Sequence, residues 1–121
     1  MKKERDIRLY LDDILEAIEK IEKYTDGLDF EQFRKDDKTG DAVIRNFSVI
    51  GEAVKNISPD IRKKYPDIPW KVIAGMRDKL VHGYFGIKYD VVWETIELRL
   101  PSLRSAIKKM LDQMDKEMEP L

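Results

Sequence analysis

The chain has 121 residues, with 23 Lys and Arg against 24 Asp and Glu, a formal net charge of -1, a single histidine and no cysteine. The lack of cysteine excludes disulfides, cysteine-ligated metal centres and thiol nucleophiles, and a lone histidine excludes the usual multi-histidine metal sites. Any imidazole chemistry must therefore involve His82. A near-neutral chain also has no long-range positive field to attract nucleic acid, so binding of a polyanion would need a local patch.

The length predicts a single domain over residues 1–121. The longest stretch without Asp, Glu, Lys or Arg covers the eight residues 80–87, which is far short of the roughly 18–20 apolar residues that a membrane span needs. The first residues, MKKERDIRLYLDD, are charged throughout and lack the apolar centre of a secretory signal. We therefore expect a cytoplasmic protein.

Apolar residues recur at helical spacing along the first half of the chain. A helix is expected from Arg5 to Tyr24, and Gly27 would end it. A short turn of helix is expected over Asp29–Arg34, and a second long helix over Gly40–Ile57. The positions predicted to face the core are Ile7, Leu11, Ile14, Ile18 and Ile21 in the first helix and Val43, Ile44, Phe47, Ile50, Val54 and Ile57 in the second.

Prolines and glycines divide the second half of the chain. Ser58 is a suitable N-cap for a brief helix over Pro59–Lys64, and Pro66 would stop it. A further helix is expected from Pro69 toward Gly83, a natural C-terminal glycine.

The last helix is expected to begin near Asp90, with a kink or split at Pro101 and a polar tail that frays after Met114. No run alternates between apolar and polar residues as a strand would. The sequence therefore predicts an all-α fold, an antiparallel helical bundle of four to five helices with a kink near Pro101.

The segment Gly75-Met-Arg-Asp-Lys-Leu-Val-His-Gly-Tyr84 concentrates polar chemistry beside glycines. Arg77 and His82 are five residues apart, about 140° around an ideal helix, so they could converge on one ligand only near a helix end. An arginine binds phosphate oxygens, an imidazole moves protons near neutral pH, and the phenol of Tyr84 adds a donor or a stacking face. Together these groups suit phosphodiester chemistry.

Simpler interpretations of the same residues stay open. His82 could cap the carbonyls at a helix C-terminus, and Arg77 with Asp78 could be a surface ion pair. Tyr84 could be a half-buried aromatic residue. The basic run Arg62-Lys63-Lys64 could be a solvated helix face or part of a binding patch.

The run Arg77-x-x-x-x-His82-x-Tyr84 is similar to the R-x4-H-x-Y motif of the HepT-like toxin ribonucleases, members of the HEPN superfamily. The resemblance extends, in the order of that family, over roughly Arg5 to Met118. Its further segments are Asp41-Ala-Val-Ile-Arg-Asn46, Ile50-Gly-Glu-Ala53, Lys64-Tyr-Pro-Asp-Ile-Pro-Trp70, Gly75-Met-Arg77, Leu80-Val-His-Gly-Tyr84 and Val92-Trp-Glu-Thr95.

This resemblance implies a HEPN-like helical domain and a metal-independent endoribonuclease without a cofactor, acting as the toxin of a toxin–antitoxin pair. The family's catalytic residues fall on Arg77 and His82, and the polar residue after the arginine falls on Asp78. The motif tyrosine falls on Tyr84, the residue to which a nucleotidyltransferase antitoxin of the MntA type attaches AMP in the family. The implied substrate is RNA, either tRNA or mRNA.

Cleavage of RNA without a metal uses the 2′-hydroxyl as nucleophile and needs one group to accept a proton and another to donate one. Because one chain offers one imidazole, a two-fold dimer that brings together both copies of His82 and Arg77 is the simplest solution. Candidates for contacting the RNA backbone are Lys71, Lys79 and Lys88, with Arg62-Lys63-Lys64 as a further basic run. The alternative function is a non-catalytic helical module that binds a nucleotide or a nucleotidyltransferase partner.

Overall fold

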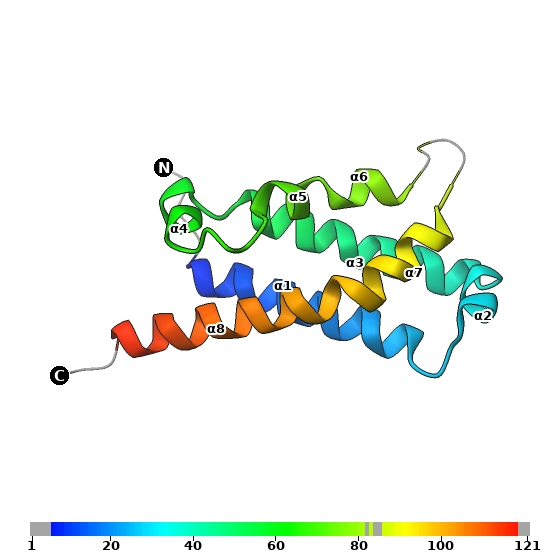
Figure 1. Cartoon of the computed structure of the whole chain (residues 1–121), viewed down its shortest axis with the longest axis horizontal. Coiled ribbons are helices and arrows are strands. Elements are labelled where there is room, and N and C mark those ends of the chain that lie inside the picture. The colour runs from blue at the N-terminus through cyan, green and yellow to red at the C-terminus, as the bar shows by residue number, and fades with distance from the viewer. Residues whose placement is uncertain (1–5, 82, 84–85, 119–121) are drawn as a thin grey trace.

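Three long helices form the body of the protein. The structure, a computed structural model, describes residues 6–81, 83 and 86–118. Helices α1 (Ile7–Thr25), α3 (Asp37–Lys55) and α8 (Leu100–Met118) each have 19 residues. α1 packs against both of the others, and both run antiparallel to it (Figure 1). The predicted all-α fold is confirmed.

Five shorter helices complete the part of the chain that the structure describes: α2 (Phe30–Arg34), α4 (Pro59–Lys64), α5 (Trp70–Ala74), α6 (Met76–Leu80) and α7 (Tyr89–Leu98). α5 and α6 lie along α3, whereas α7 packs on α2 and α8 at one end of the bundle (Figure 1). Within these described ranges, no helix is both long enough and apolar enough to cross a membrane.

The core is built from the apolar stripes of the long helices. Four of the five predicted positions in α1 are completely buried, and Ile7 packs against the edge of the core. All six predicted positions of the second stripe are buried as well. Helix α8 closes the core with Leu103, Ile107 and Met110. The periodicity of the sequence therefore identified the buried faces of α1 and α3.

Helix α3 begins three residues before the expected start at Gly40. The cause is Asp36, whose carboxylate accepts hydrogen bonds from the Thr39 backbone N–H at 3.0 Å and from the Thr39 hydroxyl at 2.6 Å. Gly40 then lies inside the helix, where a Cβ atom would stand 2.8 Å from Cε1 of Tyr89. The glycine there makes room for the tyrosine of α7.

A second close approach fixes α5 against α3. A Cβ atom on Gly51 would lie 3.3 Å from the backbone oxygen of Ala74. Gly40 and Gly51 are eleven residues apart, which is about three helical turns, so both glycines lie on nearly the same side of α3. This side of α3 therefore receives both Tyr89 of α7 and the end of α5, directly before the break that leads into the Arg77 helix.

The single helix expected from Pro69 toward Gly83 is divided and shorter than predicted. Gly75 separates α5 from α6, because it leaves helical geometry with φ -97° and ψ 3°. α6 ends at Leu80, and the extended Val81 forms an isolated antiparallel bridge with Ile87. Gly83 does adopt a positive φ of 63°, but it lies beyond the helix end instead of forming it.

Pro101 splits the last helical segment, one of the two predicted outcomes. It is the second residue of α8, where a missing backbone donor has little cost. The predicted fraying after Met114 is wrong, since α8 stays helical to Met118. The guanidinium group of Arg8 explains the difference, because it contacts the Met114 carbonyl oxygen at 3.4 Å and the Asp115 carboxylate at 2.9 Å.

Candidate active site

Helix α6 places Arg77 on the surface, directly after the break at Gly75. The guanidinium group of Arg77 lies 3.6 Å from the carboxylate of Asp78, and the two side chains are 48% and 84% exposed. Such a solvent-exposed ion pair contributes at most about 1 kcal/mol, so it does not hold the arginine rigidly. Arg77 is therefore available to a ligand.

The loop that follows α6 is closed at its base by two contacts. The Lys88 backbone N–H donates to the Leu80 carbonyl oxygen at 2.9 Å, and Val81 pairs with Ile87. Gly83 and Gly86 adopt positive φ angles of 63° and 99°, which favour glycine. The predicted site residues His82 and Tyr84 belong to this loop but lie outside the described residues.

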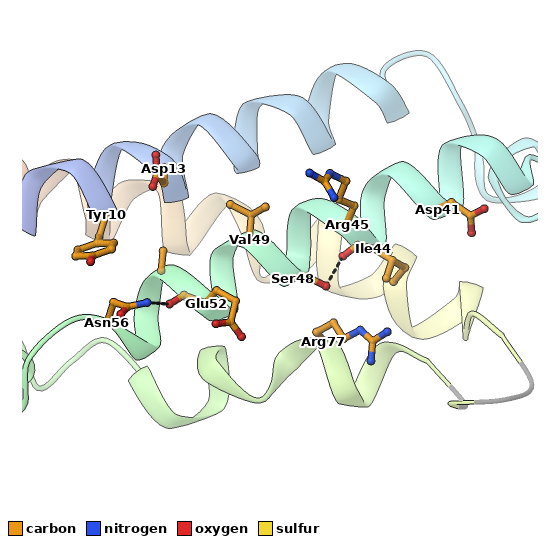
Figure 2. A pocket seen from close by; sticks show the side chains of 11 residues that line it. Tyr10, Asp13, Asp41, Ile44, Arg45, Ser48, Val49, Glu52, Asn56 and Arg77 are labelled. Atoms are coloured by element: carbon orange, nitrogen blue, oxygen red, sulfur yellow. Dashed lines mark hydrogen bonds between the residues drawn. The ribbon is translucent and has the colours of Figure 1, made fainter. Parts of the chain in front are cut away.

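Arg77 also lines a groove between α1, α3 and α6. This α1–α3–α6 groove has a volume of about 580 Å³. Its floor is α3, and Arg77 approaches that floor from the α6 side (Figure 2). The polar residues that line it are Tyr10, Asp13, Asp41, Arg45, Ser48, Glu52, Asn56 and Arg77. The arginine of the predicted motif therefore faces a surface that the motif itself does not reveal.

Charges of both signs face this groove. Arg45 and Arg77 supply two cations, and Asp13, Asp41 and Glu52 supply three carboxylates. Arg45 is exposed, and the structure shows no hydrogen bond or ion pair between it and any other described residue. The polar residues that α3 contributes to the groove recur every three or four residues in the sequence, so they can be assigned to one helix face. The same spacing is also typical of an ordinary solvated helix face.

The base of the loop is linked to α3 through Tyr89, the first residue of α7. Its hydroxyl group donates to the Asp37 carboxylate at 3.1 Å. Burial raises the pKa of Tyr89 to about 12, with smaller contributions from this hydrogen bond and from the charge of Asp37. The phenol is therefore neutral at physiological pH and acts as a structural donor.

The three lysines predicted to contact RNA do not line the groove. Lys71 and Lys79 are exposed on α5 and α6, and Lys88 is half-buried directly before α7. All three therefore lie on the segment that carries Arg77 and the loop, but outside the groove wall.

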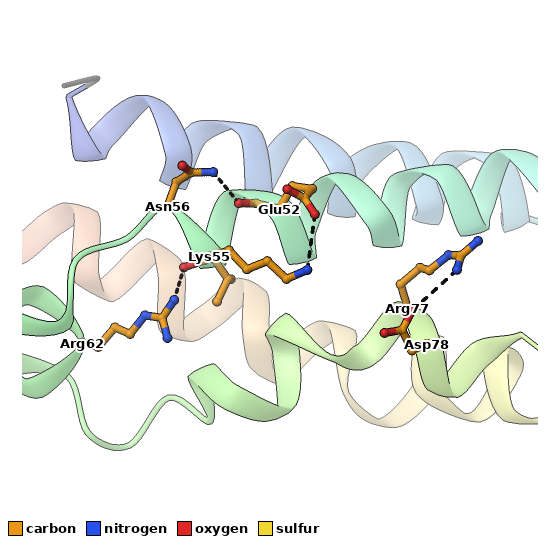
Figure 3. A network of polar contacts seen from close by, with 7 residues as sticks. Glu52, Lys55, Asn56, Arg62, Arg77 and Asp78 are labelled. Carbon is orange, nitrogen blue, oxygen red and sulfur yellow. Dashed lines mark hydrogen bonds and ion pairs between the residues drawn. The ribbon is translucent and has the colours of Figure 1, made fainter. Parts of the chain in front are cut away.

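Arg62 has a structural role that the basic run did not predict. Its guanidinium group donates to the backbone oxygen of Val54 at 2.6 Å, in the last turn of α3, and to that of Ile57 at 3.1 Å, two residues beyond the helix. Arg62 lies beside this end of α3 (Figure 3). These contacts add a charged donor at the end of the helix, where the Val54 carbonyl oxygen also accepts the Ile57 backbone N–H at 3.1 Å. Lys63 and Lys64 are exposed, so the run divides into one capping residue and two solvated lysines.

The chain belongs to the ribonuclease HepT-like family. The model of this family, described as Ribonuclease HepT-like, matches residues 14–110. This range contains Arg77, Asp78 and the loop that follows them. No group of three or more His, Asp or Glu side chains among the described residues is placed to hold a metal ion.

Individual relatives agree with this family. The chain is 50% identical over 101 residues to "Probable ribonuclease HepT" of Thermococcus cleftensis, and the match covers 84% of this chain and 92% of that protein. It is 44% identical over 115 residues to "Putative RNase MJ0127" of Methanocaldococcus jannaschii, and that match covers 95% of each. No solved structure matches the chain.

Proposed function

We propose that this member of a ribonuclease family cleaves RNA internally, without a metal ion, at a site that two copies of the chain complete. The observation that carries the proposal is the position of Arg77, which is exposed, only weakly paired and faces the α1–α3–α6 groove. His82, five residues later, is the single imidazole of the chain. The two residues are the proposed catalytic groups.

The proposed reaction is an internal transfer at phosphorus. The RNA 2′-hydroxyl oxygen forms a bond to phosphorus, and the bond from phosphorus to the 5′-oxygen breaks. One His82 imidazole accepts the proton of the 2′-hydroxyl group, and the His82 imidazole of the second copy donates a proton to the leaving 5′-oxygen. The Arg77 guanidinium groups stabilise the negative charge that develops on the phosphorane. The products are a 2′,3′-cyclic phosphate and a 5′-hydroxyl group.

Asp78 is proposed as a supporting residue. Its carboxylate can bias the orientation of the Arg77 guanidinium group through the 3.6 Å contact, although both side chains are well exposed. The expected effect is small, because an exposed ion pair contributes about 0–1 kcal/mol. Asp78→Asn should therefore retain most of the activity that Arg77→Ala loses.

The proposal extends to regulation by a partner. Acting as a toxin, the chain would be silenced when an MntA-type nucleotidyltransferase attaches AMP to Tyr84. The added phosphate would repel the RNA backbone by its negative charge, and the adenosine would obstruct it by its bulk. Mass spectrometry of the chain co-expressed with such a partner tests this extension, and the absence of AMP on Tyr84 would refute it.

The direct test is cleavage of an RNA oligonucleotide by the purified wild-type chain in EDTA. The expected products end in a 2′,3′-cyclic phosphate, and a substrate with 2′-deoxyribose at the cleaved position should resist. Arg77→Ala and His82→Ala should each lose most activity, by about 100-fold or more. Arg99→Ala, an exposed arginine between α7 and α8, is the matched control and should cleave normally.

Two outcomes would contradict the proposed function. Full activity of His82→Ala would remove the catalytic assignment. Absence of cleavage by the wild-type chain, together with a nucleotide-induced rise in melting temperature, would support the alternative of a non-catalytic binding module.

A further inference from the structure

The floor of the α1–α3–α6 groove is a stripe of polar residues along the exposed side of α3. The members of this α3 stripe are Asp41, Arg45, Ser48, Glu52 and Asn56, and all of them line the groove (Figure 2). Steps of four, three, four and four residues keep them on one side of the helix. The stripe therefore presents an ordered row of charged and uncharged polar side chains to the molecule that covers the groove.

The order of these side chains is self-complementary. A two-fold axis through the midpoint between Ser48 and Val49 would align Arg45 with the partner subunit's Glu52 and Asp41 with the partner subunit's Asn56. Two-fold symmetry repeats each contact, so two copies would form two Arg–Glu pairs and two Asp–Asn pairs. We infer that the α3 stripe is the surface on which two copies of this chain pair, with the two α3 helices antiparallel.

The charges of the stripe are at most weakly paired with other described residues of the same chain. Arg45 and Glu52 are seven residues apart, about 10 Å along the helix axis, which is too far for a direct ion pair. Glu52 contacts Lys55 at 3.4 Å, and these side chains are 71% and 57% exposed. Such a contact is weak and easily exchanged for another. Both ends of the proposed intersubunit pair are therefore available.

The uncharged members of the stripe fit the same arrangement. The hydroxyl group of Ser48 donates to the Ile44 carbonyl oxygen of its own helix at 3.1 Å. The hydroxyl donor at the centre of the stripe therefore needs no hydrogen-bond partner from a second copy. The Asn56 amide donates one N–H to the Glu52 carbonyl oxygen at 2.8 Å. Its second N–H is a suitable donor to the partner subunit's Asp41.

The charge of the groove favours a second copy over RNA as the direct occupant of the stripe. Two arginines and three carboxylates line one groove. A phosphate backbone laid along the stripe would meet Asp41 and Glu52, and like charges at contact distance repel it. A second copy brings an arginine to Glu52 instead. RNA would then approach the Arg77 side of the groove, at the edge of the paired helices.

This inference rests on the proposed two-copy site and defines the surface that forms it. Arg77 lines the same groove as the stripe, so pairing through α3 brings the Arg77 residues of both copies to one assembly face. The tests below measure association without RNA. A failure of the pairing surface is therefore distinguishable from a failure of the ribonuclease assignment.

Two charge reversals test the pairing. Arg45→Glu would place a carboxylate of each copy against the partner subunit's Glu52, and Glu52→Arg would place two guanidinium groups against each other. Each variant alone should weaken the homodimer by roughly tenfold or more, because like charges meet twice across the two-fold axis. Sedimentation velocity over a concentration series gives the dissociation constants. Lys108→Glu, an exposed position on α8, is the control and should dimerise like the wild type.

An equimolar mixture of the Arg45→Glu and Glu52→Arg variants is the decisive sample. In a mixed dimer, one contact pairs the two introduced side chains, a carboxylate with a guanidinium group. The symmetry-related contact pairs the two unchanged residues, Glu52 of the first variant and Arg45 of the second. The mixture should therefore form dimers with near wild-type affinity although each variant alone does not. Circular dichroism of each variant checks that the helices remain intact.

Three results would overturn the inference. The first is a wild-type chain that stays monomeric at high micromolar concentration. The second is unchanged dimerisation of both single variants. The third is weakened dimerisation of both variants without rescue in the mixture. Loss of RNA binding by Arg45→Glu with unchanged dimerisation would identify the groove as an RNA surface instead.

Discussion

Arg62 and Lys63 are adjacent basic residues, but in the structure only Arg62 contacts the end of α3. The prediction is that Arg62→Ala destabilises the fold, whereas Lys63→Ala does not. The guanidinium group of Arg62 makes two hydrogen bonds to carbonyl oxygens at the end of α3, at 2.6 and 3.1 Å, and the side chain is half-buried. The Lys63 side chain is exposed. Adjacent residues of similar charge should therefore behave differently.

The magnitude follows from the number and kind of these bonds. A hydrogen bond from a charged donor contributes about 1.5–3 kcal/mol when well buried, and partial exposure lowers that figure. A cation at a helix C-terminus adds about 0.3–1 kcal/mol. Arg62→Ala should thus lower the free energy of unfolding by about 2–3 kcal/mol. For a domain of this size, that change corresponds to a fall in melting temperature of roughly 8–12 °C.

Thermal unfolding followed by circular dichroism measures this difference. Arg62→Lys is an informative third variant, since its ammonium group can reach one carbonyl but cannot repeat the two-pronged contact, so an intermediate loss is expected. Equal melting temperatures for Arg62→Ala, Lys63→Ala and the wild type would refute the capping role. Equal losses of RNA affinity for Arg62→Ala and Lys63→Ala, without a difference in stability, would instead support the interpretation that both residues belong to an RNA-binding patch.

Three further predictions concern the contacts that hold the helices together. Gly40→Ala places a Cβ atom 2.8 Å from Tyr89 and should lower the free energy of unfolding, measured by chemical denaturation, by about 1–3 kcal/mol. A denaturant midpoint equal to that of the wild type would contradict the close approach. The pKa of Tyr89 is raised from 10.0 to about 12, so the stabilisation by its neutral phenol should be complete below pH 10 and be lost as the pH rises to about 12. Between pH 10 and 12 the free energy of unfolding should therefore fall less for Tyr89→Phe than for the wild type. An equal fall of the free energy of unfolding in the two proteins would refute this. Arg8→Ala removes the contact with the Met114 carbonyl oxygen and should speed amide hydrogen exchange beyond Met114, whereas exchange unchanged from the wild type would show that the end of α8 is held by other contacts.

The buried faces of the long helices could be predicted because a single physical signal determines them. Apolar residues at steps of three and four must face the core, and the stripe of α1 does so at Leu11, Ile14 and Ile18. The start of α3 could not be predicted in the same way. Gly40 has a low intrinsic helix propensity, but the Asp36 cap starts the helix three residues before it.

The break within the Arg77 segment shows a second limit of sequence patterns. The apolar residues of this segment keep helical spacing across Gly75, so periodicity predicts one helix where the structure has two. A single glycine can be tolerated in a helix or can end it. Here Gly75 ends α5, directly after the Ala74 carbonyl oxygen that approaches Gly51.

The candidate site was predicted only in part. A local motif points to Arg77, and the structure places that residue on an exposed face. The groove could not be predicted, because Arg45 and Glu52 are distant from Arg77 in sequence and their spacing is also typical of a solvated helix face. Only the packing of α6 along α3 reveals that these residues share a surface.

The central claim is that cleavage needs both copies of the chain. It is tested by mixing wild-type protein with His82→Ala at constant total concentration, after subunit exchange. If each active site needs the imidazoles of two copies, only wild-type dimers cleave RNA, and an equal mixture should retain about a quarter of the wild-type rate. A rate of about one half, proportional to the wild-type fraction, would show that each chain acts alone and would contradict the composite site.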